Sequence, residues 1–361
     1  MVKKIRTTGF LLLLIVSQFS FGQTNKDKAL EIGNQAVKLE DQGDYKDAIK
    51  LFEEAQKLDP DKIDYPYEIA YSYMQLKEYK TAINIVEKLT EHKDVEDVIY
   101  ELLGNAYDYL GKPEKAISTY ESGLKKFPNS GRLYLELGVM QKAKKDYDKA
   151  VNYFEKGIMV APKFSSNYYW AAKLYCGSTE EVWGMIYGEL FMNLERRSER
   201  TSEISKLLYD TYKSEIKFTN DSSMSVSFCK QMTINAVNIS GSKDITLPFC
   251  MIYEPTLALA IIPEKSININ SLDRIRGRFL ATYFDKGFDK THPNILFDYQ
   301  DKISKSGHLE AYNHWILMKG DEDSFDTWHS VNQQKWDDFV KWFTDNGIVV
   351  DDAHKFYKGQ Y

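Results

Sequence analysis

The chain is poor in the residues and patterns on which most catalytic and metal sites depend. It holds 3 cysteines and 6 histidines in 361 residues. It has no Cys-x-x-Cys pair, which excludes thioredoxin-like and zinc-knuckle motifs. The His-Glu-x-x-His, Gly-x-Ser-x-Gly and phosphate-loop signatures are also missing. We therefore expect no enzyme activity, no cofactor and no metal ion.

Excess positive charge is missing as well. Lys and Arg number 47 against 53 Asp and Glu, for a net charge of −6. Nucleic-acid binding relies on clustered Lys and Arg, so a nucleic-acid partner is not expected. Beyond residue 22 no stretch approaches the ~18 consecutive apolar residues of a membrane span. We expect no integral membrane segment in the mature chain.

The first 22 residues have the pattern of a cleavable signal peptide. Lys3, Lys4 and Arg6 precede a short apolar run at residues 10–16, and small residues follow at Ser20 and Gly22. The pattern predicts cleavage before Gln23 and export to the periplasm or out of the cell. An uncleaved membrane anchor is the alternative. The ending Ser-Phe-Gly-Gln resembles that of exported Bacteroidota proteins.

Three cysteines follow, at Cys176, Cys229 and Cys250. Export would permit a disulfide between Cys229 and Cys250. The alternative is three buried thiols that act as small apolar side chains. The sequence leaves both open.

A period of 34 residues runs through the first half of the chain. Small residues, aromatic or large apolar residues, and the residues that end each period, mostly proline, recur every 34 positions. The columns are Ala48, Ala82, Ala116, Ala150; Phe52, Val86, Tyr120, Phe154; Ala36, Ala70, Gly104, Gly138; and Pro60, Asp94, Pro128, Pro162. A 34-residue period with helical patterning predicts stacked helix pairs.

Within one period, two amphipathic helices are joined by a tight turn. In the third, Gly111 ends the first helix and Pro113 opens the second, where a missing N–H costs nothing. Gly104 and Ala116 are expected where the two helix backbones cross closely. Pro128 ends the second helix, because the residue before a proline is driven out of the α region.

This pattern resembles the tetratricopeptide repeat. The resemblance implies a mainly α protein whose first part is a right-handed α-solenoid. Four units cover residues 23–162, and residues 163–196 form a degenerate fifth unit or cap, in which Gly184 replaces the alanine. After about Arg196 the register is lost, and residues 197–361 are expected to form a mostly helical domain of unrecognised type.

In such solenoids the first helices line a concave groove that binds a peptide or partner helix. The resemblance places ten residues of this chain in the groove: Tyr67, Tyr71, Met74, Glu101, Asn105, Asp108, Arg132, Leu135, Lys142 and Tyr169. They make an aromatic patch, an acidic stretch and a few basic residues. The alternative is an ordinary exposed surface of a spacer.

Helical periodicity continues in the second half. It predicts helices over residues 196–216, 270–284, 295–304, 308–318 and 324–329, with a last apolar stripe at Trp336, Phe339, Val340 and Phe343. Residues 248–262 are apolar and are expected in the core. Residues 219–243 contain alternating apolar residues, which suit a short strand or a loosely packed segment.

Any chemistry has to come from histidines and tryptophans in this half. His308, His314 and His329 lie near Asp326 in the sequence, but six residues of helix turn His308 and His314 to different faces. The first hypothesis is therefore an exported, non-catalytic protein that binds a protein or peptide in its groove. The second is a hydrolase or glycan-binding C-terminal domain carried by the repeats.

Overall fold

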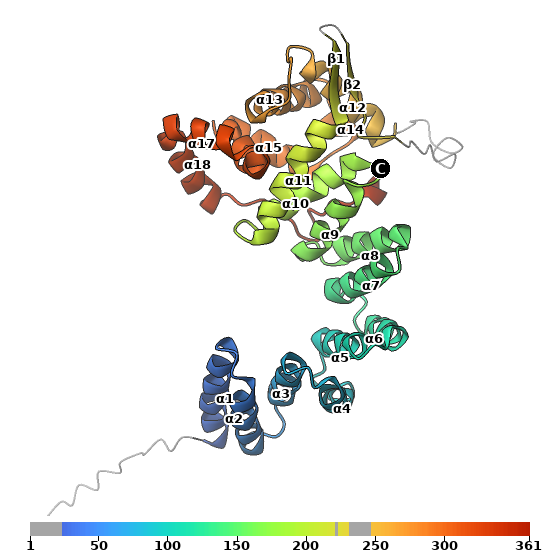
Figure 1. The fold of residues 1–361 in the computed structure, drawn as a ribbon, viewed down its shortest axis with the longest axis vertical. Coiled ribbons are helices and arrows are strands. Elements are labelled where there is room, and N and C mark those ends of the chain that lie inside the picture. The colour runs from blue at the N-terminus through green and yellow to red at the C-terminus, as the bar shows by residue number, and fades with distance from the viewer. Residues whose placement is uncertain (1–23, 221–222, 231–246) are drawn as a thin grey trace, which may run out of the picture. The chain divides into compact units, whose positions relative to one another are not determined.

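The computed structural model describes residues 24–220, 223–230 and 247–361 (Figure 1). The expected signal peptide at residues 1–22 lies outside the described residues, as does much of the region 219–243. The chain divides into two compact units, Met1–Val95 and Glu96–Tyr361. We call them the N-terminal unit and the C-terminal unit.

The N-terminal unit consists of two helix pairs. Its helices are α1 Asn25–Asp41, α2 Tyr45–Leu58, α3 Asp64–Gln75 and α4 Tyr79–Leu89. A capping box between Thr24 and Asp27 starts α1, and Gly43 turns the chain toward α2 with φ +80°. Ala48, Phe52 and Ala82 of the predicted columns are buried. The repeat pattern thus forms a core of its own here.

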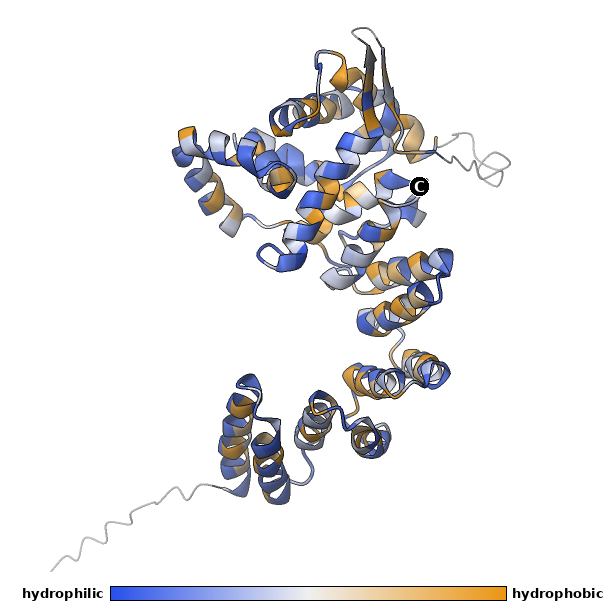
Figure 2. Cartoon of the chain, viewed as in Figure 1, coloured by the Kyte–Doolittle hydropathy of each residue, from blue (hydrophilic) through white to orange (hydrophobic). Residues whose placement is uncertain are grey.

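The C-terminal unit begins with further helix pairs of the same kind. They are α5 Asp97–Tyr109 with α6 Pro113–Lys126, α7 Gly131–Ala143 with α8 Tyr147–Val160, and α9 Ser165–Tyr175 with α10 Glu181–Leu194. Gly111 has φ +76°, Pro113 occupies the first turn of α6, and α6 ends at Lys126 before Pro128. These three predictions are confirmed. Figure 2 shows apolar and polar residues alternating along these helices, as amphipathic helices require.

The 34-residue step continues one helix further than the sequence analysis places it. Helix α11 spans Glu199–Glu215 and contacts both α9 and α10. Arg200 donates to Ser166 at 3.0 Å, and the hydroxyl of Tyr169 donates to Glu203. Both pairs are 34 residues apart, so α11 occupies the place of the next first helix in the stack. The register is therefore not lost at Arg196, although the motif residues are.

The small residues make room for rings. A Cβ on Gly104 would lie 2.1 Å from Cε1 of Tyr120, and a Cβ on Gly138 would lie 2.3 Å from Cε1 of Phe154. The tight contact is therefore between a helix backbone and an aromatic ring of the second helix, rather than between two backbones as expected. Glycine leaves the space into which that ring packs.

We expect Gly104→Ala to destabilise the C-terminal unit by about 1–3 kcal/mol, because the buried Tyr120 ring has to shift. Gly277→Ala is the matched control: it lies inside a helix with only Leu309 at 3.9 Å, so alanine should stabilise by up to about 1 kcal/mol. Urea unfolding followed by tryptophan fluorescence measures both. Equal effects of the two alanines would contradict the packing argument.

Beyond α11 the chain forms a hairpin and a group of helices. Strands β1 Ile216–Asn220 and β2 Ser223–Val226 pair antiparallel, with Ile216 opposite Val226. The helices are α12 Phe249–Ile261, α13 Ile269–Asp285, α14 Phe288–Thr291, α15 Ile295–Lys305, α16 Leu309–Leu317, α17 Glu322–Val331 and α18 Gln333–Asp345, with short 3₁₀ turns η2 Met318–Gly320 and η3 Lys358–Gln360. The predicted helices are present. No helix within the described ranges combines the length and apolar content needed to cross a bilayer.

The structure decides the cysteine pairing and corrects the core expected at residues 248–262. Cys229 and Cys250 form a disulfide, which joins the segment after β2 to α12, while Cys176 is free. The apolar stretch 248–262 is only partly core: Phe249 and Leu257 are buried, whereas Met251 is 41% and Leu259 56% exposed.

The last residues return to the repeat helices. Phe356 is buried with its ring 6.2 Å from that of Trp183 in α10, and Tyr361 stacks on His292. The backbone N–H of Lys358 donates to the Tyr187 hydroxyl at 2.7 Å. This C-terminal segment therefore joins α10 to the later helices.

Candidate functional site

The first helices of the pairs in the C-terminal unit share one face. Glu101 of α5, Leu135 of α7, Tyr169 of α9 and Glu203 of α11 are spaced by 34 residues, and each of these helices contacts the next. We call this surface the first-helix face. Seven of the ten predicted groove residues belong to it: Glu101, Asn105, Asp108, Arg132, Leu135, Lys142 and Tyr169.

One end of the first-helix face is acidic. Arg132 bridges Glu101 at 2.7 Å and Asp97 at 3.3 Å. Glu136, one position beyond Leu135, is half-buried. Burial, followed by the charges of Glu101 and Asp108, raises the pKa of Glu136 to about 7, and Arg132 offsets only part of this. The sequence analysis missed Glu136, although its position in the repeat places it next to Leu135.

The raised pKa makes the stability of the C-terminal unit depend on pH. The folded state holds the Glu136 proton up to about pH 7, whereas an unfolded chain releases it near 4.5. Stability from this group is therefore full below pH 4.5 and is lost as the pH rises through 7. We expect Glu136→Gln to stabilise the unit by about 2 kcal/mol at pH 8 and by little at about pH 4. Thermal unfolding at both pH values, with exposed Glu121→Gln as control, tests this; a pH-independent effect would contradict it.

The other end of the face is aromatic and basic. Lys142 lies over the Trp170 ring at 4.3 Å from its centroid, and Lys173 lies over the same ring at 5.5 Å. Trp170 in turn stacks on Phe154. Tyr169 is 6% exposed: its ring packs against Trp170 and Phe191 and its hydroxyl donates to Glu203 of α11, so it contributes little open surface. Trp170 is a second residue that the sequence analysis missed.

Asn105 and Leu135 are the other two predicted groove residues of this face; Asn105 lies on α5 between Glu101 and Asp108, and Leu135 lies on α7. The side-chain oxygen of Asn105 accepts a hydrogen bond of 2.6 Å from the Tyr120 hydroxyl, which leaves its amide N–H groups to the surface. Leu135 is half-buried, and Asp108 is exposed. The C-terminal unit thus brings together an acidic end, an apolar residue and a basic aromatic end.

The remaining three predicted groove residues lie on α3 of the N-terminal unit. Tyr71 is 37% exposed, Tyr67 is half-buried, and Met74 is buried at 8%. Glu68 beside them occupies the same repeat position as Glu136. Burial and the charges of Glu40 and Asp64 raise its pKa to about 7 as well. The two units therefore repeat one electrostatic feature.

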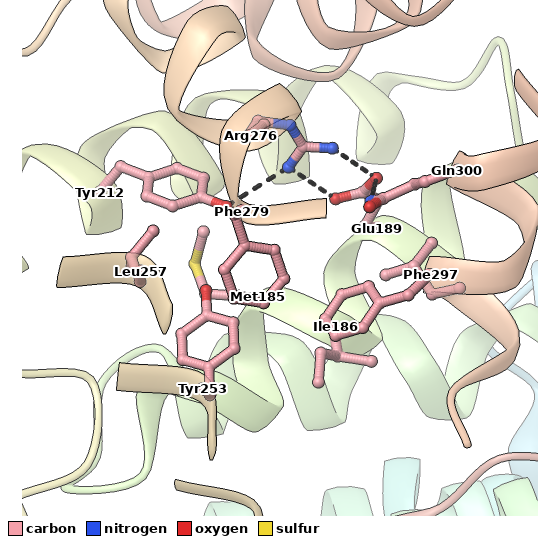
Figure 3. Close-up of a pocket in the computed structure, with 11 residues that line it drawn as sticks. Met185, Ile186, Glu189, Tyr212, Tyr253, Leu257, Arg276, Phe279, Phe297 and Gln300 are labelled. Carbon is pink, nitrogen blue, oxygen red and sulfur yellow. Dashed lines mark hydrogen bonds and ion pairs between the residues drawn. The ribbon is translucent and has the colours of Figure 1, made fainter. Parts of the chain in front are cut away.

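A buried cluster of polar side chains occupies the core of the C-terminal unit (Figure 3). Arg276 of α13 makes a two-pronged ion pair with Glu189 of α10, at 2.7 and 2.9 Å. The same carboxylate accepts from Gln300 at 2.5 Å and Tyr312 at 2.8 Å. The third guanidinium nitrogen of Arg276 donates to Asn313 at 2.7 Å. We call these five residues the Glu189–Arg276 cluster.

The Glu189–Arg276 cluster has the properties of a structural network. Burial lowers the pKa of Arg276, but the adjacent Glu189 carboxylate outweighs burial and raises it above the usual arginine value. Each charged oxygen and nitrogen of the ion pair has a partner. The adjoining cavity of about 20 Å³ has room for about one water molecule. The cluster joins α10 to α13, α15 and α16, and has no space for a substrate.

The histidines suspected of chemistry do not share a site. His314 is 1% exposed and stacks on Trp328, with ring centroids 4.0 Å apart. Burial lowers its pKa, so the ring is neutral near pH 7. His329 stacks instead on Phe325, and Asp326 is exposed. Among the described residues, no group of three or more His, Cys, Asp or Glu side chains is placed to hold a metal ion.

Comparison with solved structures finds matches to about half of the chain. A thermophilic TPR protein of Thermus thermophilus, TTC0263, is 19% identical and covers 50% of this chain and 98% of its own, with a TM-score of 0.43. PilF of Pseudomonas aeruginosa is 18% identical, with coverages of 53% and 86% and a TM-score of 0.44.

Among curated proteins, the BBSome complex member BBS4 of Bos taurus is 30% identical over 108 residues. The match covers 28% of this chain and 21% of that protein, so the chain spans about a fifth of its length. Family profiles described as tetratricopeptide repeat match residues 39–105 and 102–162. Residues 39–162 of this chain therefore carry tetratricopeptide repeats.

Proposed function

We propose that the first-helix face binds a segment of a partner protein, and that this segment places lysine or arginine side chains at the acidic end. The role is binding rather than catalysis. The observation that carries the proposal is the shortage of positive charge around Glu136. Among the described residues, Arg132 is the cation found beside Glu136, Glu101 and Asp108, and it already bridges Glu101 and Asp97.

A basic partner segment would supply the missing charge. Glu136 is held in a partly desolvated site among like charges, so a cation placed there interacts through a lower effective dielectric than in water. Leu135 and the ring of Trp170 offer apolar contact further along the same face. Apolar contacts supply affinity and charges set the register of such segments.

The experiment compares two variants of the full chain. Asp108→Lys reverses an exposed charge at the acidic end, whereas Glu121→Lys makes the same change on α6, away from the first-helix face. Binding of a fluorescent lysine-rich peptide and of a glutamate-rich peptide is followed by anisotropy. We expect Asp108→Lys to weaken binding of the basic peptide about tenfold and Glu121→Lys to leave it unchanged. Equal affinity of wild type and Asp108→Lys would overturn the proposal.

We also propose that the protein is exported. The pattern of residues 1–22 supports this, and so does the Cys229–Cys250 disulfide, because disulfides persist mainly in oxidising compartments. N-terminal sequencing of protein recovered from its own cells is expected to start at Gln23. Recovery of an intact Met1 would contradict the proposal.

A further inference from the structure

A cleft of about 330 Å³ lies between the start of α11 and the helices α16 and α18. Its floor is apolar. Trp336, Phe339, Val340 and Phe343 recur on one side of α18, and Trp315 and Met318 complete the floor from α16 and the turn after it. We call it the aromatic cleft. Its volume is within the range of small-molecule sites, and none of its residues belongs to the first-helix face.

One wall of the aromatic cleft carries uncompensated positive charge. Arg196 is fixed: it donates to the backbone carbonyl of Phe343 at 2.7 Å and lies 3.8 Å from the centroid of the Phe343 ring. Arg197 beside it is exposed. In the part of the chain that the structure describes, no carboxylate forms an ion pair with either arginine. The neighbouring Glu195 pairs with Arg200 instead. Ser198, Thr201 and Ser202 continue this wall, but the hydroxyls of Ser198 and Thr201 already donate to Glu195.

The polar groups of the floor are donors. The indole N–H groups of Trp315 and Trp336 make no hydrogen bond within the described ranges, and neither is sealed from solvent, although Trp315 is only 7% exposed. The twelve lining residues include no Asp, Glu, Asn or Gln. A ligand that fits this lining has to accept hydrogen bonds and carry negative charge. It also has to cover aromatic and aliphatic surface.

We propose that the aromatic cleft binds a small organic anion, a carboxylate joined to an apolar body about the size of one ring. The carboxylate lies at Arg197, where an arginine without a partner favours bidentate contact, and the apolar body lies on Trp336 and Val340, since Phe339 is only 1% exposed. A neutral sugar suits the cleft less well. Its hydroxyl groups also need hydrogen-bond acceptors, and the lining side chains include no carboxylate or amide oxygen to accept from them.

Binding of 4-phenylbutyrate to the full chain, measured by calorimetry and by tryptophan fluorescence, tests the proposal. The neutral amide of the same acid and the sugar N,N′-diacetylchitobiose are the comparison ligands. We expect saturable binding of the acid, at least tenfold tighter than the amide. Arg197→Gln should abolish this preference, and Val340→Glu should weaken binding of the acid at least tenfold.

Both substituted side chains are exposed, so the variants should fold; thermal unfolding checks this. Lys341→Gln removes a neighbouring exposed charge of α18 that does not line the cleft, and should leave binding unchanged. No saturable binding, equal binding of acid and amide, or an unchanged preference in Arg197→Gln each overturns the proposal. Binding of the sugar but not of the acid would overturn the proposal that the ligand is an organic anion.

Discussion

Replacement of Arg276 by methionine is expected to destabilise the C-terminal unit by about 3–5 kcal/mol. The substitution leaves the buried Glu189 carboxylate without its counter-charge, at a side chain that is about 4% exposed. An unpaired buried charge costs far more than the net contribution of the pair. Urea unfolding followed by fluorescence reports this unit alone, because the six tryptophans are all at or beyond Trp170.

A double variant separates charge burial from lost packing. Glu189→Leu combined with Arg276→Met removes both charges, so it should be less destabilised than Arg276→Met alone. Arg274→Met is the matched control on the same helix, since Arg274 pairs with Glu264 but its side chain is 53% exposed. Its effect should stay below about 1 kcal/mol. Similar losses for Arg274→Met and Arg276→Met would contradict the structural role of the cluster.

Removal of the Phe356 ring is expected to destabilise the same unit by about 3–5 kcal/mol. The ring is 2% exposed and packs against Trp183 and Tyr187 of α10, so alanine would leave a cavity between the C-terminal segment and the repeat helices. The tryptophan emission should also shift to the red, because Trp183 gains access to water. Thermal unfolding and emission spectra of Phe356→Ala measure the two effects.

His354→Ala is the control in the same segment. The His354 side chain is 61% exposed and pairs with the nearby Asp351, so its loss should change stability by less than about 0.5 kcal/mol. If Phe356→Ala and His354→Ala behave alike, the C-terminal segment does not stabilise the unit as described.

The repeat columns predicted the helix pairs well because their determinants are local. Gly111, Pro113 and Pro128 act on the backbone within a few residues, and the period of Ala116 and Tyr120 marks the buried side of one helix. Helix α11 follows the period without these residues. Arg200 and Glu203 lie 34 residues after Ser166 and Tyr169, but α11 lacks the small and aromatic residues of the repeat columns. Surface positions of a first helix accept many side chains, whereas the buried column positions accept few.

The candidate site was predictable in part. Repeat position placed Glu101, Asp108 and Arg132 on one face, and the structure brings them together. Repeat position could not show that Tyr169 and Met74 are mostly buried, because their burial depends on which residues of the neighbouring helices pack against them. Glu136 and Trp170 lie at one repeat position, and only their surroundings show that one is a desolvated acid and the other a half-buried ring beneath Lys142 and Lys173.

The sequence alone determined the helix-pair repeats and most helices of its second half, because periodicity and caps act over a few turns. Tertiary structure alone decided the rest. Glu189 and Arg276 are 87 residues apart, and neither Cys229 with Cys250 nor Arg197 with Trp336 is linked by any local pattern. Such pairs meet only when helices distant in the chain pack, since burial and charge pairing depend on that packing.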